Sequence, residues 1–165
     1  MSDSIETRIA GNHDGEGIMQ LIHRIQSVEF GVPIGLNDQK DLADVERHYG
    51  NGGDVFRIAV RDGEVVGTIA LNILQGNIAA LRKFYVAPEF RGMPWQLADR
   101  LWAEILDHSR DRNVSAIYLG VAEQFARARS YYLKNGFHPV GPEELPAAFP
   151  RTKVDRYFFR LFCGQ

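Results

Sequence analysis

The spacing of apolar residues changes several times along this 165-residue chain. Alternating or short, wholly apolar runs predict strands, whereas apolar residues that recur every three or four positions predict helices. The predicted strands cover residues 4–10, 55–60, 64–74, 77–86, 116–121, 137–140 and 154–162. The predicted helices cover residues 12–31 and 37–49, a long stretch from about residue 97, and residues 125–134.

Local sequence signals mark where these elements begin and end. Asn12 and Asp14 are candidate caps of the first helix, and Asn37 is the candidate cap of the second. The apolar positions of the first helix that are predicted to face the core are Ile18, Leu21, Ile22, Ile25 and Val28. Arg61-Asp62-Gly63 predicts a tight hairpin turn between two strands.

The order of these elements, β-α-α-β-β-β-α-β-α-β-β, indicates the fold class. A strand-helix-strand unit in the second half requires a parallel crossover, whereas the hairpin requires antiparallel pairing. We therefore predict an α/β (α+β) fold in which a mixed, mostly antiparallel sheet of about six to seven strands carries helices on both faces. One domain is expected over residues 1–165.

Composition narrows the possible partners. The net charge of −2 argues against nucleic acid, which would favour a basic surface. A single cysteine, Cys163, allows no internal disulfide and is typical of a reducing cytoplasm. Neither a leader-like apolar segment nor a membrane-spanning run is found, so we expect a cytoplasmic protein without a membrane partner. The five histidines lack paired metal-ligand spacing, and no metal is expected.

A candidate anion site follows the strand predicted over residues 77–86. Pro88 ends this strand because it cannot donate to the sheet, and Arg91-Gly92 allows a close turn before the long helix. The first N–H groups of a helix have no partner within it and lie at the positive end of its dipole. The sequence thus predicts a phosphate or pyrophosphate site, with an ordinary strand-to-helix turn as the alternative.

Two segments resemble motifs of the GNAT superfamily, the acyl-CoA-dependent N-acyltransferases. They are Phe-Tyr-Val-Ala-Pro-Glu-Phe-Arg-Gly over residues 84–92 and Ala-Arg-Ser-Tyr-Tyr-Leu-Lys-Asn-Gly-Phe over residues 128–137. With the strand pattern around them, the resemblance covers nearly the whole chain. It implies a GNAT-like sheet whose fourth and fifth strands separate and admit the pantetheine arm of acetyl-CoA.

The resemblance also implies which residues contact the cosubstrate. These are Phe84, Tyr85 and Val86 beside pantetheine, Arg91, Gly92, Met93, Pro94, Trp95 and Gln96 around the pyrophosphate, and Phe125 and Ala128 on the following helix. The family loop usually has small residues where this chain has Pro94 and Gln96. Pro94 lacks an N–H group, although proline in a first helical turn would suit the helix start. Phe125 stands where many members have asparagine.

Catalytic roles follow from the same resemblance. Tyr132 stands four residues before Gly136, as the family's general acid does, and a phenol with pKa about 10 can protonate the departing CoA thiolate. A plain core tyrosine is the alternative. The glutamate that many members carry on the fourth strand is replaced here by Ala80. Glu29 is the candidate base or amine contact, with a solvated residue at a helix end as the alternative.

The sequence therefore predicts an acyltransferase enzyme that moves an acetyl group from acetyl-CoA to a primary amine of a small molecule or peptide by direct attack. The changes in the loop and the missing glutamate leave a non-catalytic acyl-CoA sensor as the first alternative. A structural domain without a CoA site is the second. The acceptor amine stays open, as does the oligomeric state, for which the family suggests a possible homodimer.

Overall fold

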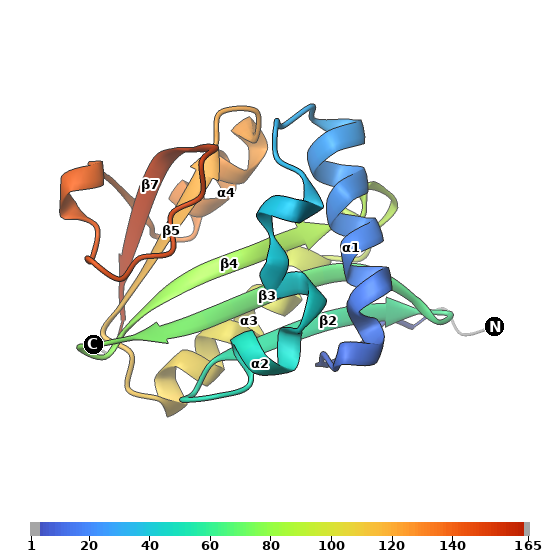
Figure 1. Ribbon diagram of the computed structural model, residues 1–165, viewed down its shortest axis with the longest axis horizontal. Coiled ribbons are helices and arrows are strands. Elements are labelled where there is room, and N and C mark those ends of the chain that lie inside the picture. Colours follow the sequence, from blue (N-terminus) through green and yellow to red (C-terminus); the bar gives the residue numbers. More distant parts are fainter. Residues whose placement is uncertain (1–3, 164–165) are drawn as a thin grey trace.

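Seven strands form a single mixed sheet within residues 4–163, the part of the chain that the computed structural model describes (Figure 1). The strands are β1 (Glu6–Ile9), β2 (Val55–Arg61), β3 (Glu64–Leu74), β4 (Ile78–Val86), β5 (Ala116–Ala122), β6 (His138–Val140) and β7 (Asp155–Phe162). Their order is β1-β2-β3-β4-β5-β7-β6, and only β4 and β5 pair in parallel. The predicted fold class is confirmed.

Helices cover both faces of the sheet. Figure 1 shows α1 (Gly15–His23) and α2 (Val45–Tyr49) in front of the central strands and α3 (Leu97–Asp111) behind them. Helix α4 (Ala126–Lys134) contacts α3 through the hydrogen bond from Tyr131 to Asp99. Besides a π-helical segment at Arg24–Glu29, short 3-10 turns lie at Asn12–Asp14, Leu36–Asp38, Lys40–Ala43, Pro88–Phe90 and Pro142–Glu144. No helix between residues 4 and 163 has both the length and the apolar character needed to cross a membrane.

The first predicted helix is interrupted by a π-helical segment. Helix α1 continues as a π segment over Arg24–Glu29, in which the N–H of Phe30 bonds to the carbonyl of Ile25, five residues back. This wider turn rotates the later side chains away from the α-helical period. Val28 was predicted to face the core, but its side chain is 74% exposed, so this prediction is wrong.

The second predicted helix is also broken. Two 3-10 turns precede α2, and the backbone leaves the helical region at Gln39 and again at Asp44. Asp44, rather than Asn37, caps α2, because its carboxylate accepts a hydrogen bond from the N–H of Arg47 at 3.3 Å. The break brings the 3-10 turns across the face of β4, where they supply Gln39 and Asp41 to the polar contacts described below.

Strands β4 and β5 pair over a short distance only. Their pairing begins at Ile78 and Ala116 and ends at Ala80 and Tyr118. Both strands then continue, β4 as far as Val86, without pairing with each other. The separation of the fourth and fifth strands that the family resemblance implies is therefore confirmed.

A β-bulge interrupts β4 at Lys83, which has a left-handed φ of +56°. Thr68 of β3 lies opposite Tyr85 and Ala70 lies opposite Arg82, so β4 holds one residue more than β3 across this interval. The Thr68 hydroxyl donates to the Lys83 carbonyl at 2.6 Å. Because the bulge breaks the alternation of side chains, the adjacent residues Arg82 and Lys83 both contact the segments that lead into α2.

The apolar core has a part on each face of the sheet. The part behind the sheet joins α3 to β3, β4 and β5 and includes Ile69, Leu81, Leu101, Ile105 and Leu119. The part in front joins α1 and α2 to β2 and includes Ile18, Ile22, Tyr49, Phe56 and Ile58. The sheet that positions the site is thus held from both sides.

Phe56→Ala should lower the free energy of unfolding by about 3–5 kcal/mol, because it removes a fully buried ring and leaves a cavity. The Phe56 ring is 2% exposed and packs edge-on against Tyr49 at 5.1 Å. Urea denaturation measures the loss. The matched control is Phe162→Ala, whose ring is 63% exposed and whose loss should stay below about 1 kcal/mol. Equal losses in the two variants would contradict this description of the core.

Candidate functional site

A cavity of about 570 Å³ opens where β4 and β5 separate. Its walls come from β4, β5 and α4, from the start of α3, and from the segments between α1 and α2 and before β7. Both apolar and charged side chains reach it. The lining cations are Arg82, Lys83, Arg91, Arg127 and Lys134, and the lining carboxylates are Asp99 and Asp155.

One wall of the cavity is an unpaired edge of β4. Residues 81–86 bond to β3 along one edge, while the edge toward β5 has lost its partner beyond Ala80. Unpaired N–H and C=O groups of a strand can bond an extended ligand as they would an added strand. The residues predicted to lie beside pantetheine, Phe84, Tyr85 and Val86, all line the cavity on this edge.

The cavity continues to the first turn of α3. The N–H of Gln96 bonds to the Gly92 carbonyl at 2.9 Å and that of Arg100 to the Gln96 carbonyl at 3.1 Å. The N–H groups of residues 97–99 therefore remain without an intrahelical partner and form the positive end of the helix. Pro94 lies before the helix rather than in its first turn, so the predicted role of Pro94 in starting the helix is wrong.

The loop before α3 is joined to the end of the π segment. Both Glu29 oxygens accept hydrogen bonds from the Arg91 guanidinium, at 2.5 and 2.8 Å, and the same guanidinium lies 5.7 Å from the Phe30 ring. The Arg91 Nε also donates to the Val86 carbonyl at 2.9 Å. Arg91, Gly92, Met93 and Gln96 line the cavity, whereas Glu29, Pro94 and Trp95 are not part of its lining.

Tyr132 lines the cavity from α4. Its ring packs against Phe84, Phe137 and Phe159, with centroid distances of 6.4, 5.5 and 6.0 Å. Within residues 4–163 its hydroxyl makes no hydrogen bond to the protein. Burial raises the pKa of Tyr132 above its ordinary value, so the phenol stays protonated at neutral pH. An unpaired, protonated hydroxyl beside a cavity is free to donate to a ligand.

Its neighbour Tyr131 is engaged elsewhere. The Tyr131 hydroxyl donates to Asp99 of α3 at 2.7 Å, and burial together with this carboxylate raises the pKa of Tyr131. Phe125 is the N-cap residue of α4, and its ring contacts those of Phe30 at 5.0 Å and Tyr85 at 6.0 Å. Phe125 and Ala128 both line the cavity, as the predicted cosubstrate contacts should.

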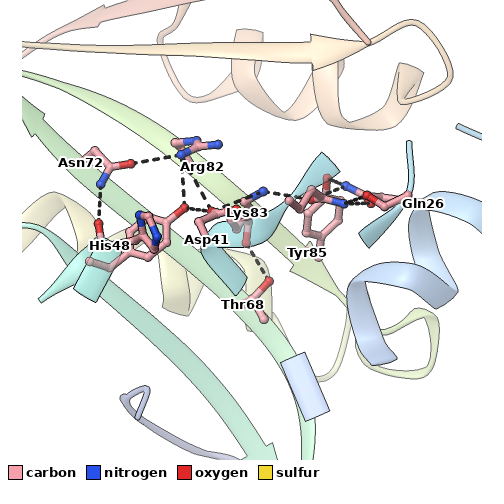
Figure 2. Close-up of polar contacts among 11 residues, drawn as sticks. Gln26, Asp41, His48, Thr68, Asn72, Arg82, Lys83 and Tyr85 are labelled. Carbon is pink, nitrogen blue, oxygen red and sulfur yellow. Dashed lines mark hydrogen bonds and ion pairs between the residues drawn. The ribbon is translucent and has the colours of Figure 1, made fainter. Parts of the chain in front are cut away.

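A buried polar cluster that the sequence did not predict lies on the α1–α2 side of the cavity (Figure 2). The Lys83 ammonium donates to Gln39 at 2.9 Å and lies 3.6 Å from an Asp41 oxygen. That same oxygen accepts a hydrogen bond from Tyr49 and lies 3.9 Å from Arg82. The only sequence signal was the presence of two adjacent cations in an otherwise apolar strand.

The π segment holds this cluster on its other side. Gln26 donates to the Tyr85 hydroxyl at 2.8 Å and accepts from the Gln39 amide at 2.8 Å, so β4 and the 3-10 turns are tied to the end of α1. Burial raises the pKa of Tyr85 to about 12. Since buried polar groups must find partners, these contacts fix the arrangement of the three segments.

Burial and the neighbouring charges shift the pKa values of Lys83 and Asp41. Burial lowers the pKa of Lys83 to about 8, against the opposing effect of Asp41. Burial alone would raise the pKa of Asp41, but the charge of Lys83, the Tyr49 hydrogen bond and the charge of Arg82 together lower it. Lys83 therefore remains mostly protonated at pH 7, as the ammonium form that the cluster stabilises.

Asp155 is a second cavity residue that the sequence did not reveal. Its carboxylate lies over Gly120 of β5, where a Cβ atom would come within 2.7 Å of an Asp155 oxygen. Burial raises the pKa of Asp155, although the N–H of Thr152 donates to it at 2.9 Å. The site thus contains a carboxylate with increased proton affinity. Between residues 4 and 163, no three His, Cys, Asp or Glu side chains gather as a metal site would need.

This chain is similar in sequence to known acetyltransferases. A family model described as the acetyltransferase (GNAT) family matches residues 19–137. The N-acetylaspartate synthetase of Danio rerio is 32% identical over 126 residues, which are 73% of this chain and 44% of that protein. The chain spans less than half the length of the curated relatives it matches.

Solved structures share the whole architecture. A GNAT-family acetyltransferase from Staphylococcus aureus Mu50 aligns with a TM-score of 0.92 at 31% identity, over 96% of this chain and 99% of that one. The PaiA N-acetyltransferase of Thermoplasma acidophilum, solved in complex with coenzyme A, shares the fold with a TM-score of 0.71 at 19% identity, over 97% and 99% of the two chains. The family match over most of its length, carried on this sheet and its separated strands, shows that the chain belongs to the acetyltransferase (GNAT) family.

Proposed function

We propose that the protein transfers an acetyl group from acetyl-CoA to a primary amine by direct attack. The main support for this proposal is the set of groups that line one cavity. A single cavity contains the unpaired edge of β4, the free N–H groups at the start of α3 and the unpaired hydroxyl of Tyr132. These are the three features that a thioester with a pantetheine arm and a pyrophosphate requires.

The residues of the cavity fit acetyl-CoA as a cosubstrate. The free edge over residues 81–86 can bond the amide groups of the pantetheine arm, and the N–H groups of residues 97–99 can bond the pyrophosphate. The lining cations Arg127 and Lys134 add favourable charge for phosphate, whereas the Arg91 guanidinium is paired with Glu29. A structural relative of the same fold, PaiA of Thermoplasma acidophilum, binds coenzyme A.

In this proposal Tyr132 acts as the general acid. The amine nitrogen forms a bond to the thioester carbonyl carbon, the carbon–sulfur bond breaks, and the Tyr132 hydroxyl donates to the departing sulfur. The raised pKa of Tyr132 keeps the proton on its oxygen until negative charge develops on sulfur. Unpaired β4 N–H groups stabilise the oxyanion that forms at the carbonyl.

The acceptor must also lose a proton, and we assign its removal to Asp155. Burial raises the pKa of Asp155, and the carboxylate lines the cavity beside β5. Glu29, the base candidate from sequence, has both oxygens bonded to Arg91 and lies outside the cavity lining. Asp155 is therefore better suited to take the proton from an acceptor ammonium.

The curated relatives suggest the first acceptor to test. They are N-acetylaspartate synthetases, at 30–32% identity to this chain. We propose L-aspartate, an α-amino acid whose amine can enter the cavity beside Asp155, as the leading acceptor, and other small primary amines as the comparison set.

Tyr132→Phe should lower kcat about 100-fold, because removal of a positioned acid typically costs 10²-fold or more. The Kd for acetyl-CoA should change less than about twofold, since the ring that packs against Phe84 is kept. Release of the CoA thiol measures turnover, and calorimetric titration measures binding. Tyr131→Phe should keep kcat within a few-fold, because the Tyr131 hydroxyl is bonded to Asp99. Equal losses in both variants would contradict the role of Tyr132.

Acetyl-CoA at about 100 times its Kd should stabilise the protein by about 2.7 kcal/mol and raise Tm by several degrees. S-acetylpantetheine lacks the pyrophosphate and should bind at least about tenfold more weakly, because it leaves the start of α3 unused. Differential scanning fluorimetry gives the shift, and calorimetry gives the affinities. Absence of any shift with acetyl-CoA would favour a structural domain. Binding without turnover of any amine would favour a sensor.

A further inference from the structure

The adjacent cations Arg82 and Lys83 lie on the same side of β4. In a regular strand these adjacent side chains would point to opposite faces, and the bulge at Lys83 brings both to the α1–α2 side of the cavity. The bulge holds Lys83 at φ +56°, a conformation that costs a non-glycine residue free energy. Such strain at a cavity indicates a functional arrangement.

The pair is incompletely neutralised by its direct contacts. A single oxygen of Asp41 lies 3.9 Å from Arg82, lies 3.6 Å from Lys83 and also accepts from Tyr49. Asp155 interacts with both cations electrostatically, but within residues 4–163 it forms no ion pair with either of them. At ion-pair distance the two cations therefore share one carboxylate, and the low dielectric around them strengthens their attraction for an anion.

The donors of Arg82 are also incompletely used. Its Nη1 atom donates to Tyr49 at 3.3 Å and to Asn72 at 3.4 Å (Figure 2), whereas in the described part of the chain Nη2 and Nε have no partner. Arg82 and Lys83 both line the cavity. A guanidinium with a free edge next to an ammonium matches the geometry of a carboxylate.

The position of the pair fits the acceptor rather than the cosubstrate. Lys83 faces the α1–α2 side, while the next residue, Phe84, packs on the other face against Tyr131 and Tyr132. The bulge therefore separates the side of β4 that carries Arg82 and Lys83 from the side that holds the proposed acid. An acceptor bound on the first side would present its amine toward the thioester on the second.

We propose that Arg82 and Lys83 form a carboxylate-binding site for the acceptor, so that the acceptors are amino acids rather than simple amines. This inference rests on the proposed acetyltransferase function and adds the residues that bind a carboxylate of its second substrate. Asp41, Gln39 and Gln26 are positioning residues, since they hold the Lys83 ammonium and the segments around it. Asp155 faces the ammonium end of the acceptor.

The first test uses the wild-type protein and four acceptors of nearly equal size. L-aspartate has two carboxylates, L-asparagine and L-isoasparagine have one each, and L-aspartic acid diamide has none. Release of the CoA thiol gives kcat/KM for each acceptor. We expect the diamide to be turned over at least tenfold less efficiently than L-aspartate, and the two single amides to show which carboxylate is bound.

The second test removes one charge. Lys83→Gln keeps a hydrogen bond to Gln39 possible and should raise KM for L-aspartate at least tenfold, with a much smaller change in kcat. It should also reduce the preference for L-aspartate over the diamide, which a purely structural defect would leave unchanged. Lys40→Gln, at an exposed lysine outside the cavity lining, is the matched control and should keep the wild-type KM.

The outcomes separate the two proposals. Equal kcat/KM for L-aspartate and its diamide in the wild-type protein would overturn the carboxylate site while the acetyltransferase function remained. Unchanged preference in Lys83→Gln, with acetyl-CoA binding intact, would also overturn the role of Lys83. Acetyl-CoA binding without turnover of any amine would overturn the proposed function and, with it, the acceptor site.

Discussion

The separation of β4 from β5 is the constraint on which the rest of the site depends. Past Ala80 and Tyr118 the two strands no longer satisfy each other's backbone groups, and unpaired backbone groups away from water are costly. The gap is tolerated because it forms a cavity, in which solvent or an extended ligand can bond the free edge. Because α4 and the first turn of α3 both border this gap, their side chains and N–H groups can reach a ligand in the cavity.

Around this gap, irregular backbone positions the polar groups. The π segment at the end of α1 presents Gln26, the broken second helix presents Gln39 and Asp41, and the bulge in β4 presents Lys83. Each irregularity costs some local stability, and the buried hydrogen bonds among these residues offset that cost. The apolar cores on the two faces of the sheet are regular by comparison and provide rigidity.

Sequence patterns predicted the regular parts and missed the irregular ones. The order of strands and helices along the chain, the Asp62-Gly63 hairpin and the fold class followed from periodicity and turn chemistry, because those signals are local. Val28, the cap at Asp44 and the place of Pro94 were misjudged, since a π turn and a broken helix depend on tertiary contacts. The motifs indicated Tyr132 and the loop at Arg91. They did not indicate Lys83, which reaches the cavity because of the bulge in β4, or Asp155, which begins a strand that follows a long loop.

The left-handed backbone of Lys83 has a consequence for protein engineering. Glycine adopts this conformation without the steric penalty that lysine incurs, so a search for stabilising substitutions would favour glycine at position 83. The same substitution would delete the buried ammonium that Gln39 and Asp41 surround. Relief of the backbone strain would therefore be offset by the loss of the ion-pair partner of the buried Asp41 carboxylate, and lysine at this position is consistent with the acceptor site proposed above.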